Sequence, residues 1–137
     1  MIGRFRIPSL FIDIPLYKSC GNAQEIVDAP QSAAWIEWRN MIAIADHASQ
    51  SGMWRLKWAI PRLTRAIVEM GGKRTYICTK KQRGIIDGGY MIDASGRVVN
   101  GMIDIELVIY TCTGRTPGGN TEVWLTFWKE KAEAPPW

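Results

Sequence analysis

The side chains best suited to covalent chemistry in this sequence are the only histidine, His47, and one of three cysteines, Cys112. Each follows an apolar run typical of a β-strand: Met-Ile-Ala-Ile-Ala-Asp precedes His47, and Leu-Val-Ile-Tyr-Thr precedes Cys112. A thiolate attacks acyl carbon well, and an imidazole beside it can ionise the thiol and then protonate a leaving amine. Their separation along the chain is no obstacle, because only the fold must bring them together.

Simpler interpretations of the same residues remain open. A cysteine in an apolar run is often a small buried hydrophobic side chain, and a lone histidine is often a hydrogen-bonded turn residue. We interpret Cys20 as an exposed bystander and Cys78 as a packing residue. Asp46 is a candidate to orient His47, but a side chain seldom turns onto the ring of its neighbour in sequence.

Length and composition indicate one folded domain. The 137 residues are 47% hydrophobic and 22% charged, which argues against disorder and gives enough length for one core. We expect a single domain over residues 1–131 and a short proline-rich tail over residues 132–137. No apolar run is long enough to span a membrane, and Pro8 and Asp13 come too early for a signal peptide, so we expect neither in this chain.

Charge and metal-ligand spacing make several classes of function less favoured. The net charge of +4 favours a mildly basic solvated face over a nucleic-acid surface, so no nucleic-acid partner is expected. There is no Cys-x-x-Cys pair, and one histidine gives no zinc ligand set. The glycines between Gly114 and Gly119 match no phosphate-binding loop. We therefore expect no metal and no cofactor.

Alternation of apolar residues with a period of two is the main structural signal. Along residues 102–113, Val108, Tyr110 and Cys112 alternate with Leu107, Ile109 and Thr111, and residues 122–128 repeat the pattern. The turn-forming run 114–120 separates these segments, which predicts two adjacent, paired strands. Further strands are expected at residues 6–7, 12–17 and 41–45, with hairpins joining 64–70 to 74–79 and 89–93 to 96–100. Helices are expected at Ser32–Arg39, with Ser32 as N-cap, and at Ala23–Val27. Many short strands with little helix favour an all-β barrel or sandwich.

Five segments, in order along the chain, resemble segments of the sortases. The first is Ile7–Tyr17, which contains Ile-Pro and Asp-Ile-Pro-Leu-Tyr, and the second is the strand that runs into Asp-His at Asn40–His47. The others are Trp54–Lys57, Gly72–Cys78 and Leu107–Cys112, the last of which resembles the Thr-Leu-x-Thr-Cys signature. Each segment is loose alone, but the ordered set covers the chain from Ile7 to Trp128.

The resemblance implies a closed, sortase-like β-barrel of about eight strands with one or two short helices, and with His47 and Cys112 on neighbouring strand ends. It implies a cysteine transpeptidase that cleaves a peptide sorting signal, holds the acyl group as a thioester on Cys112 and transfers it to an amine or to water. His47 would be the general acid and base, Thr111 would orient the site or contact substrate, and Tyr110 would line the pocket. The implied partners are a peptide or protein with a sorting-type motif and an amine acceptor, and the family implies a cell-surface setting.

One departure from the sortase pattern keeps a second hypothesis open. Sortases carry an arginine early in the strand after the cysteine, and the alignment places that role at Thr121. Asn120 could donate a neutral hydrogen bond from the neighbouring position, and Arg115 could approach from the intervening loop. The alternative function is a catalytically weakened sortase-fold module that binds a peptide or scaffolds an assembly. A nucleic-acid-binding barrel is the third and least favoured hypothesis.

Overall fold

The computed structural model describes residues 2–18, 33–38, 41–46, 53–87, 90–99, 106–115 and 117–131. The expected helix at Ala23–Val27, the tail 132–137, Cys20 and His47 lie outside these residues. The described elements, in chain order, are β1 (Gly3–Ile7), η1 (Pro8–Leu10), β2 (Ile12–Lys18), β3 (Ala33–Trp38), β4 (Met41–Asp46), η2 (Met53–Trp58), β5 (Arg65–Glu69), β6 (Lys73–Asp87), β7 (Tyr90–Ile92), β8 (Leu107–Arg115) and β9 (Thr121–Glu130).

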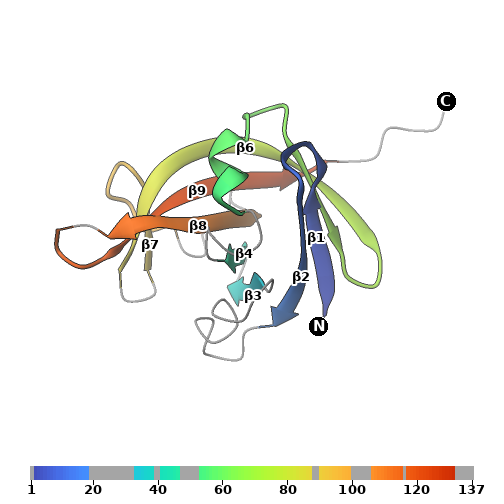
Figure 1. Ribbon diagram of the computed structural model, residues 1–137, viewed down its shortest axis with the longest axis horizontal. Helices are drawn as coiled ribbons and strands as arrows, with labels where there is room; N and C mark the ends of the chain where they lie inside the picture. The colour runs from blue at the N-terminus through green and yellow to red at the C-terminus, as the bar shows by residue number, and fades with distance from the viewer. Residues whose placement is uncertain are drawn as a thin grey trace.

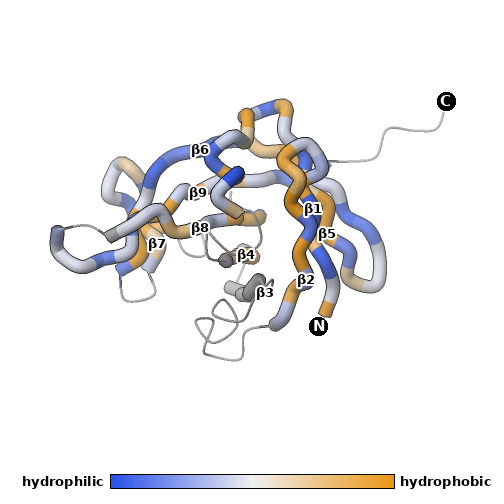
Figure 2. Tube along the Cα trace, viewed as in Figure 1, coloured by the Kyte–Doolittle hydropathy of each residue, from blue (hydrophilic) through white to orange (hydrophobic). Residues whose placement is uncertain are grey.

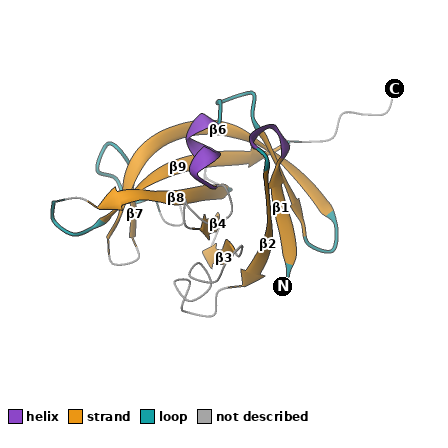
Figure 3. Cartoon of the chain, in the orientation of Figure 1, coloured by secondary structure: helices purple, strands orange, loops and turns teal. Residues whose placement is uncertain are grey.

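The strands form one mixed sheet, and Figures 1 and 3 show how strongly it curls. Their order is β5-β1-β2-β3-β4-β8-β9-β6, the pairing of β5 with β6 closes the ring, and β7 adds to β6 as a ninth strand. Among the strands that the structure describes, only β2–β3 and β4–β8 are parallel, and the other pairs are antiparallel. The expected barrel of about eight strands is therefore confirmed, together with two short 3₁₀ helices, η1 and η2.

The long strand β6 makes closure possible. Its first residues pair with β5 across the hairpin at Gly71 and Gly72, as expected, and its later residues pair with β9 and then β7. A register shift between Cys78 and Lys80 separates the segment that pairs with β5 from most of the ladder with β9. An extra residue bends a strand and increases its twist, so this bulge turns β6 from one partner to the other.

Alternation along β8 and β9 creates two apolar clusters, one on each face of these strands. The first contains Leu107, Ile109 and Trp128 together with residues from β1, β2, η2 and β5. The second contains Val108, Val123 and neighbours from β4, β7 and β9. The hydropathy tube in Figure 2 shows the apolar segments of β1, β2 and β5 lying together. Both faces of β8 are thus covered by side chains, which makes it a rigid central strand.

The prediction of a helix at Ser32–Arg39 is wrong, because residues 33–38 form strand β3. This strand pairs with β2 on one side and with β4 on the other. Two backbone ladders outweigh the weak local signal of one candidate N-cap, and Trp and Ile suit a strand. In the described parts of the chain, no helix has the length and apolarity needed to cross a membrane.

Thr126→Val is expected to lower the free energy of unfolding by about 1–3 kcal/mol. The buried Thr126 hydroxyl donates to the Ile109 carbonyl (2.6 Å) and accepts from Trp128 Nε1–H (2.7 Å), so valine removes both hydrogen bonds from the buried interior. Urea unfolding measures the effect. The matched control is Thr79→Val, which removes an exposed hydroxyl that donates to the Phe127 carbonyl at 3.1 Å. An equal loss in both variants would contradict the proposed role of the buried pair.

Candidate active site

The parallel pairing of β4 with β8 organises the candidate site. The register runs from Ile42 opposite Leu107 to Asp46 opposite Thr111. Asp46 is the residue before His47, and Thr111 is the residue before Cys112. The two segments that the sequence analysis singled out therefore lie side by side and point in the same direction. His47 itself lies outside the described residues.

Cys112 lies near the end of β8, on the face that carries the second apolar cluster. It is partly buried and packs against that cluster, and its cross-strand neighbour on β9 is Val123. Its sulfur is a thiol and is not part of a disulfide. The position combines a rigid backbone with a side chain that reaches the surface in part, as an accessible nucleophile requires.

Cys78 occupies a different environment, in agreement with its interpretation as a packing residue. It is fully buried in the first cluster, and its Sγ lies 3.7 Å from the Lys80 carbonyl oxygen. Burial raises the pKa of the Cys78 thiol to about 11. A thiol with this pKa is almost entirely protonated at neutral pH, so Cys78 is inert as a nucleophile.

The two residues before Cys112 lie on opposite faces of β8, as alternation requires. Tyr110 packs against the same cluster as Cys112. Burial raises the pKa of Tyr110 to about 12, so its hydroxyl stays protonated and can donate a hydrogen bond. Thr111 is 1% exposed. Of the two roles expected for Thr111, its burial favours orienting the strand over contacting a substrate.

A β-bulge follows Cys112 and changes the place of Arg115. The register shifts between Cys112 and Gly114, so that Gly114 pairs with Glu122 and Arg115 with Thr121. Arg115 is therefore the last residue of β8. The sequence-based prediction, which placed Arg115 on the loop between the two strands, is wrong. The sequence missed this because the bulge extends the ladder into the turn-forming run. The backbone of Arg115 lies directly opposite Thr121, where the family resemblance expects an arginine.

Residues 117–120 lead into β9. Gly119 adopts a φ of +86°, a value that side chains other than glycine rarely tolerate, and Asn120 follows it immediately before Thr121. Asn120 is partly buried. The turn thus holds Asn120 at the same end of the β8–β9 pair as Cys112.

A second charged group lies beside the bulge. The Thr113 hydroxyl donates to Glu122 Oε1 at 3.2 Å, and Arg83 Nη1 lies 2.5 Å from the same oxygen. The Arg83 guanidinium also lies 4.9 Å from the centre of the Trp124 ring. Arg83 is thus engaged by two partners on β9.

The turn after β7 positions apolar residues of the second cluster. The expected turn at residues 93–96 is confirmed, with Gly96 at φ +87°. Asp93 accepts hydrogen bonds from Ser95 N (2.9 Å), Ser95 Oγ (2.6 Å) and Arg97 N (2.9 Å). These bonds, above all that from the Ser95 hydroxyl, lower the pKa of Asp93 to about 2. The turn holds Met91 and Val99 together through a backbone hydrogen bond of 2.9 Å, and both pack in the cluster that Cys112 contacts.

The role of Asp93 in this turn was not predicted, although the sequence contains a signal for it. Aspartate followed two residues later by serine is typical of a turn in which the carboxylate accepts from the backbone.

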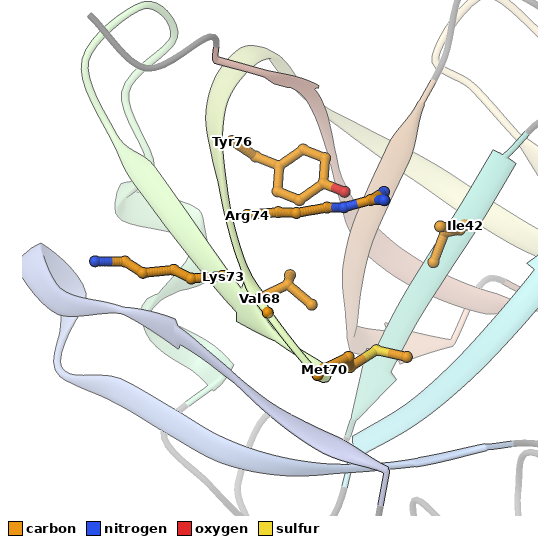
Figure 4. A pocket seen from close by; sticks show the side chains of 8 residues that line it. Ile42, Val68, Met70, Lys73, Arg74 and Tyr76 are labelled. Atoms are coloured by element: carbon orange, nitrogen blue, oxygen red, sulfur yellow. The ribbon is translucent and has the colours of Figure 1, made fainter. Parts of the chain in front are cut away.

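A pocket of about 400 Å³ lies at the other end of the strands and is separate from Cys112. Ile42 at the start of β4 and Met70, Arg74 and Tyr76 of the β5–β6 hairpin line it, and Figure 4 shows Arg74 extending beside the Tyr76 hydroxyl. Burial raises the pKa of Tyr76. Ile42 pairs with Leu107, the first residue of β8, whereas Cys112 lies near the last.

Within the parts of the chain that the structure describes, no three histidine, cysteine or acidic side chains gather as a metal site would need.

The fold is similar to those of solved sortases. It matches Streptococcus agalactiae sortase C1 with a TM-score of 0.66 and 18% identity, over 98% of this chain and 69% of that one. It also matches Clostridium perfringens sortase C, solved with the C-terminal cell wall sorting motif, with a TM-score of 0.68 and 14% identity, over 96% of this chain and 71% of that one. No protein-family model and no curated protein matches the sequence. The chain therefore has the sortase fold, as its sequence resemblance implied.

Asp93→Asn is expected to destabilise the protein by about 1.5–3 kcal/mol at neutral pH, because amide oxygen replaces a charged acceptor of several hydrogen bonds. The folded state holds the Asp93 pKa near 2, below the ordinary 3.8, so the carboxylate stabilises the fold above about pH 4. That contribution is lost as pH falls toward 2. Thermal unfolding across this range should show a flatter pH dependence in the variant.

The control is Asp13→Asn, whose exposed carboxylate lies 3.0 Å from Arg4 Nε. We expect it to cost less than about 1 kcal/mol. A pH profile of Asp93→Asn that equals that of the unaltered protein would contradict the role given to Asp93.

Proposed function

We propose that this protein is a cysteine transpeptidase that cleaves a peptide at a sorting-type motif and transfers the acyl part to an amine. The observation that carries the proposal is the parallel register of β4 with β8, which sets Asp46 beside Thr111. The residues that follow each of them in the chain are His47 and Cys112. The sortase fold and a partly buried thiol at Cys112 support the same reaction.

The reaction begins with attack of the Cys112 thiolate on the carbonyl carbon of the scissile peptide bond. The sulfur–carbon bond forms, the carbon–nitrogen bond breaks, and His47 gives a proton to the leaving amine. The acyl group is then a thioester on Cys112. An incoming amine attacks this thioester and loses a proton to His47, which forms a new amide and regenerates the thiolate and imidazolium pair. Water in place of the amine gives hydrolysis.

Arg115 is the residue that we propose to stabilise the oxyanion. Sortases carry this cation on the strand after the cysteine, but Thr121 occupies the corresponding position here. The bulge after Cys112 places the backbone of Arg115 directly opposite Thr121. The bulge also restores alternation, so that position 115 belongs to the same face of the β8 ladder as Cys112. In this proposal, the cation that stabilises the oxyanion therefore comes from β8, at Arg115, and not from β9.

The neighbouring residues receive supporting roles in this proposal. Tyr110 shares the face of Cys112 and lines the substrate pocket with a protonated hydroxyl. Asn120 donates a neutral hydrogen bond to the substrate from the turn before β9. Thr111 orients the end of β8 from its buried position.

The alternative is a sortase-fold module that binds a peptide without cleaving it. The observation that favours it is Thr121, an uncharged residue at the arginine position on β9. The two functions make opposite predictions for the chemical reactivity of Cys112.

Cys112→Ala is expected to abolish peptide cleavage, thioester formation and aminolysis. Intact-mass spectrometry after incubation with a sorting-signal peptide library, with and without a glycine peptide as acceptor, measures all three. Cys20→Ala and Cys78→Ala should retain activity. Iodoacetamide at neutral pH should modify Cys112 faster than Cys78, whose pKa of about 11 leaves little thiolate.

The same alkylation experiment separates the two functions. If His47→Ala slows alkylation of Cys112, the thiol is activated by the imidazole. Slow alkylation of Cys112 that His47→Ala leaves unchanged, together with peptide binding and no cleavage, would establish the binding module and reject the enzyme.

Arg115→Ala is expected to lower kcat by about 10²–10³-fold while KM changes little, since an oxyanion contact acts on the transition state. Steady-state cleavage of the selected peptide measures both constants. The matched control is Arg83→Ala, which removes a nearby cation that is held by Glu122 and Trp124. If both variants cleave at the same rate as the unaltered protein, Arg115 has no role in catalysis.

A further inference from the structure

Large apolar side chains are exposed together at one end of the barrel. Phe11 is 83% exposed, Leu63 67%, Trp58 and Ile60 52% each, and Trp54 40%. They come from the turn after η1, from η2 and from the connection between η2 and β5. Figures 1 and 2 show these three segments at the same edge of the molecule. We call these five residues the apolar surface.

Contacts between the segments hold the parts of the apolar surface next to one another. Helix η1 contacts both η2 and β5. The Arg55 guanidinium on η2 donates to the Phe11 carbonyl at 3.1 Å, and the Trp54 and Trp58 rings meet edge to face with centres 4.9 Å apart. Backbone hydrogen bonds from Leu63 and Thr64 to the Ile60 carbonyl hold the connecting turn in a compact shape.

The exposed residues are not needed to fill the core. Met53, Leu56 and Ala59 of the same segment are fully buried in the first cluster and already fix η2 against the barrel. Between them, the large apolar side chains of Trp54 and Trp58 are exposed to solvent. An apolar patch that the core does not use indicates a partner, because leaving it in water costs free energy.

Several cations lie within and beside the apolar surface. The run 53–68 contains Arg55, Lys57, Arg62 and Arg65 and no acidic residue. Lys57 Nζ lies 5.6 Å and 5.7 Å from the centres of the Trp54 and Trp58 rings, and Arg55 lies 5.0 Å from Trp54. Lys81 extends the cluster, since its Nζ donates to the Lys57 carbonyl at 2.5 Å.

This chemistry matches the interface of an anionic lipid bilayer. Tryptophan favours the headgroup region, aliphatic side chains and phenylalanine enter the acyl boundary, and lysine and arginine attract anionic headgroups. Single-stranded nucleic acid fits less well. It binds by stacking bases on aromatic rings, whereas cations already lie over Trp54 and Trp58 and two of the most exposed residues, Leu63 and Ile60, are aliphatic.

We propose that the apolar surface docks this protein on an anionic lipid bilayer. Phe11, Ile60 and Leu63 insert below the headgroups, the two tryptophans lie at headgroup level, and the cations contact lipid phosphates. This proposal does not depend on the proposed catalytic function.

Sedimentation with vesicles tests the proposal. The protein should bind vesicles of phosphatidylcholine mixed with phosphatidylglycerol, bind weakly to phosphatidylcholine alone, and dissociate as salt increases. Binding should shift tryptophan emission to shorter wavelength. The double variant F11D/L63D should lose binding, and Lys57→Gln should weaken it about fivefold, as expected for one cation at a membrane surface.

The matched control is Tyr90→Asp on β7, which changes an aromatic residue of similar exposure, 59%, away from the apolar surface. It should bind as the unaltered protein does. Circular dichroism checks that each variant is folded.

Any of four results would overturn the proposal. The first is that the protein does not bind the anionic vesicles, and the second is that Tyr90→Asp loses as much vesicle binding as F11D/L63D does. The third is that a single-stranded oligonucleotide binds more tightly than the vesicles do and that F11D/L63D abolishes this binding. The fourth is that the protein binds no vesicles but forms a dimer that F11D/L63D disrupts.

Discussion

The parallel ladder between β4 and β8 is the constraint on which the rest of this structure depends. These strands come from distant parts of the chain, and their register sets Asp46 level with Thr111. Parallel strands need a long connection, which here carries η2, the β5–β6 hairpin and β7. The connection therefore closes the barrel and supplies Met91 and Val99 to the second cluster, which covers the β8 face carrying Cys112.

Burial of β8 on both faces gives the candidate site its rigidity. A strand packed on one side can slip or bend, but β8 is fixed by Leu107 and Ile109 on one face and by Val108 on the other. The bulge at its end is the one irregularity, and it sets the position of Arg115 opposite Thr121. The two ends of the barrel carry different features. The pocket at the β5–β6 hairpin lies where β4 and β8 begin, and Cys112 lies where β8 ends.

Much of this fold could be predicted where apolar residues alternate without interruption. The two faces of β8 and of β9, their pairing, and the hairpin at Gly71 and Gly72 follow directly from a period of two and from turn-forming residues. The prediction was wrong at Ala33–Trp38, because a short run of Ala, Trp and Ile fits a helix or a strand equally well. There the decision comes from two neighbouring strands, which no local pattern contains.

The sequence by itself determined which side chains can react and which faces of each strand are apolar, since both depend on residue type and spacing. It singled out Cys112 and the strand that leads to His47, and it resembled the sortases in segment order. Only the tertiary structure decided that β4 lies beside β8, that a bulge carries Arg115 to the position opposite Thr121, and that the turn at Phe11 lies against η2. Contacts between distant segments depend on how strands pair around a closed barrel, and that pairing is set by the whole core.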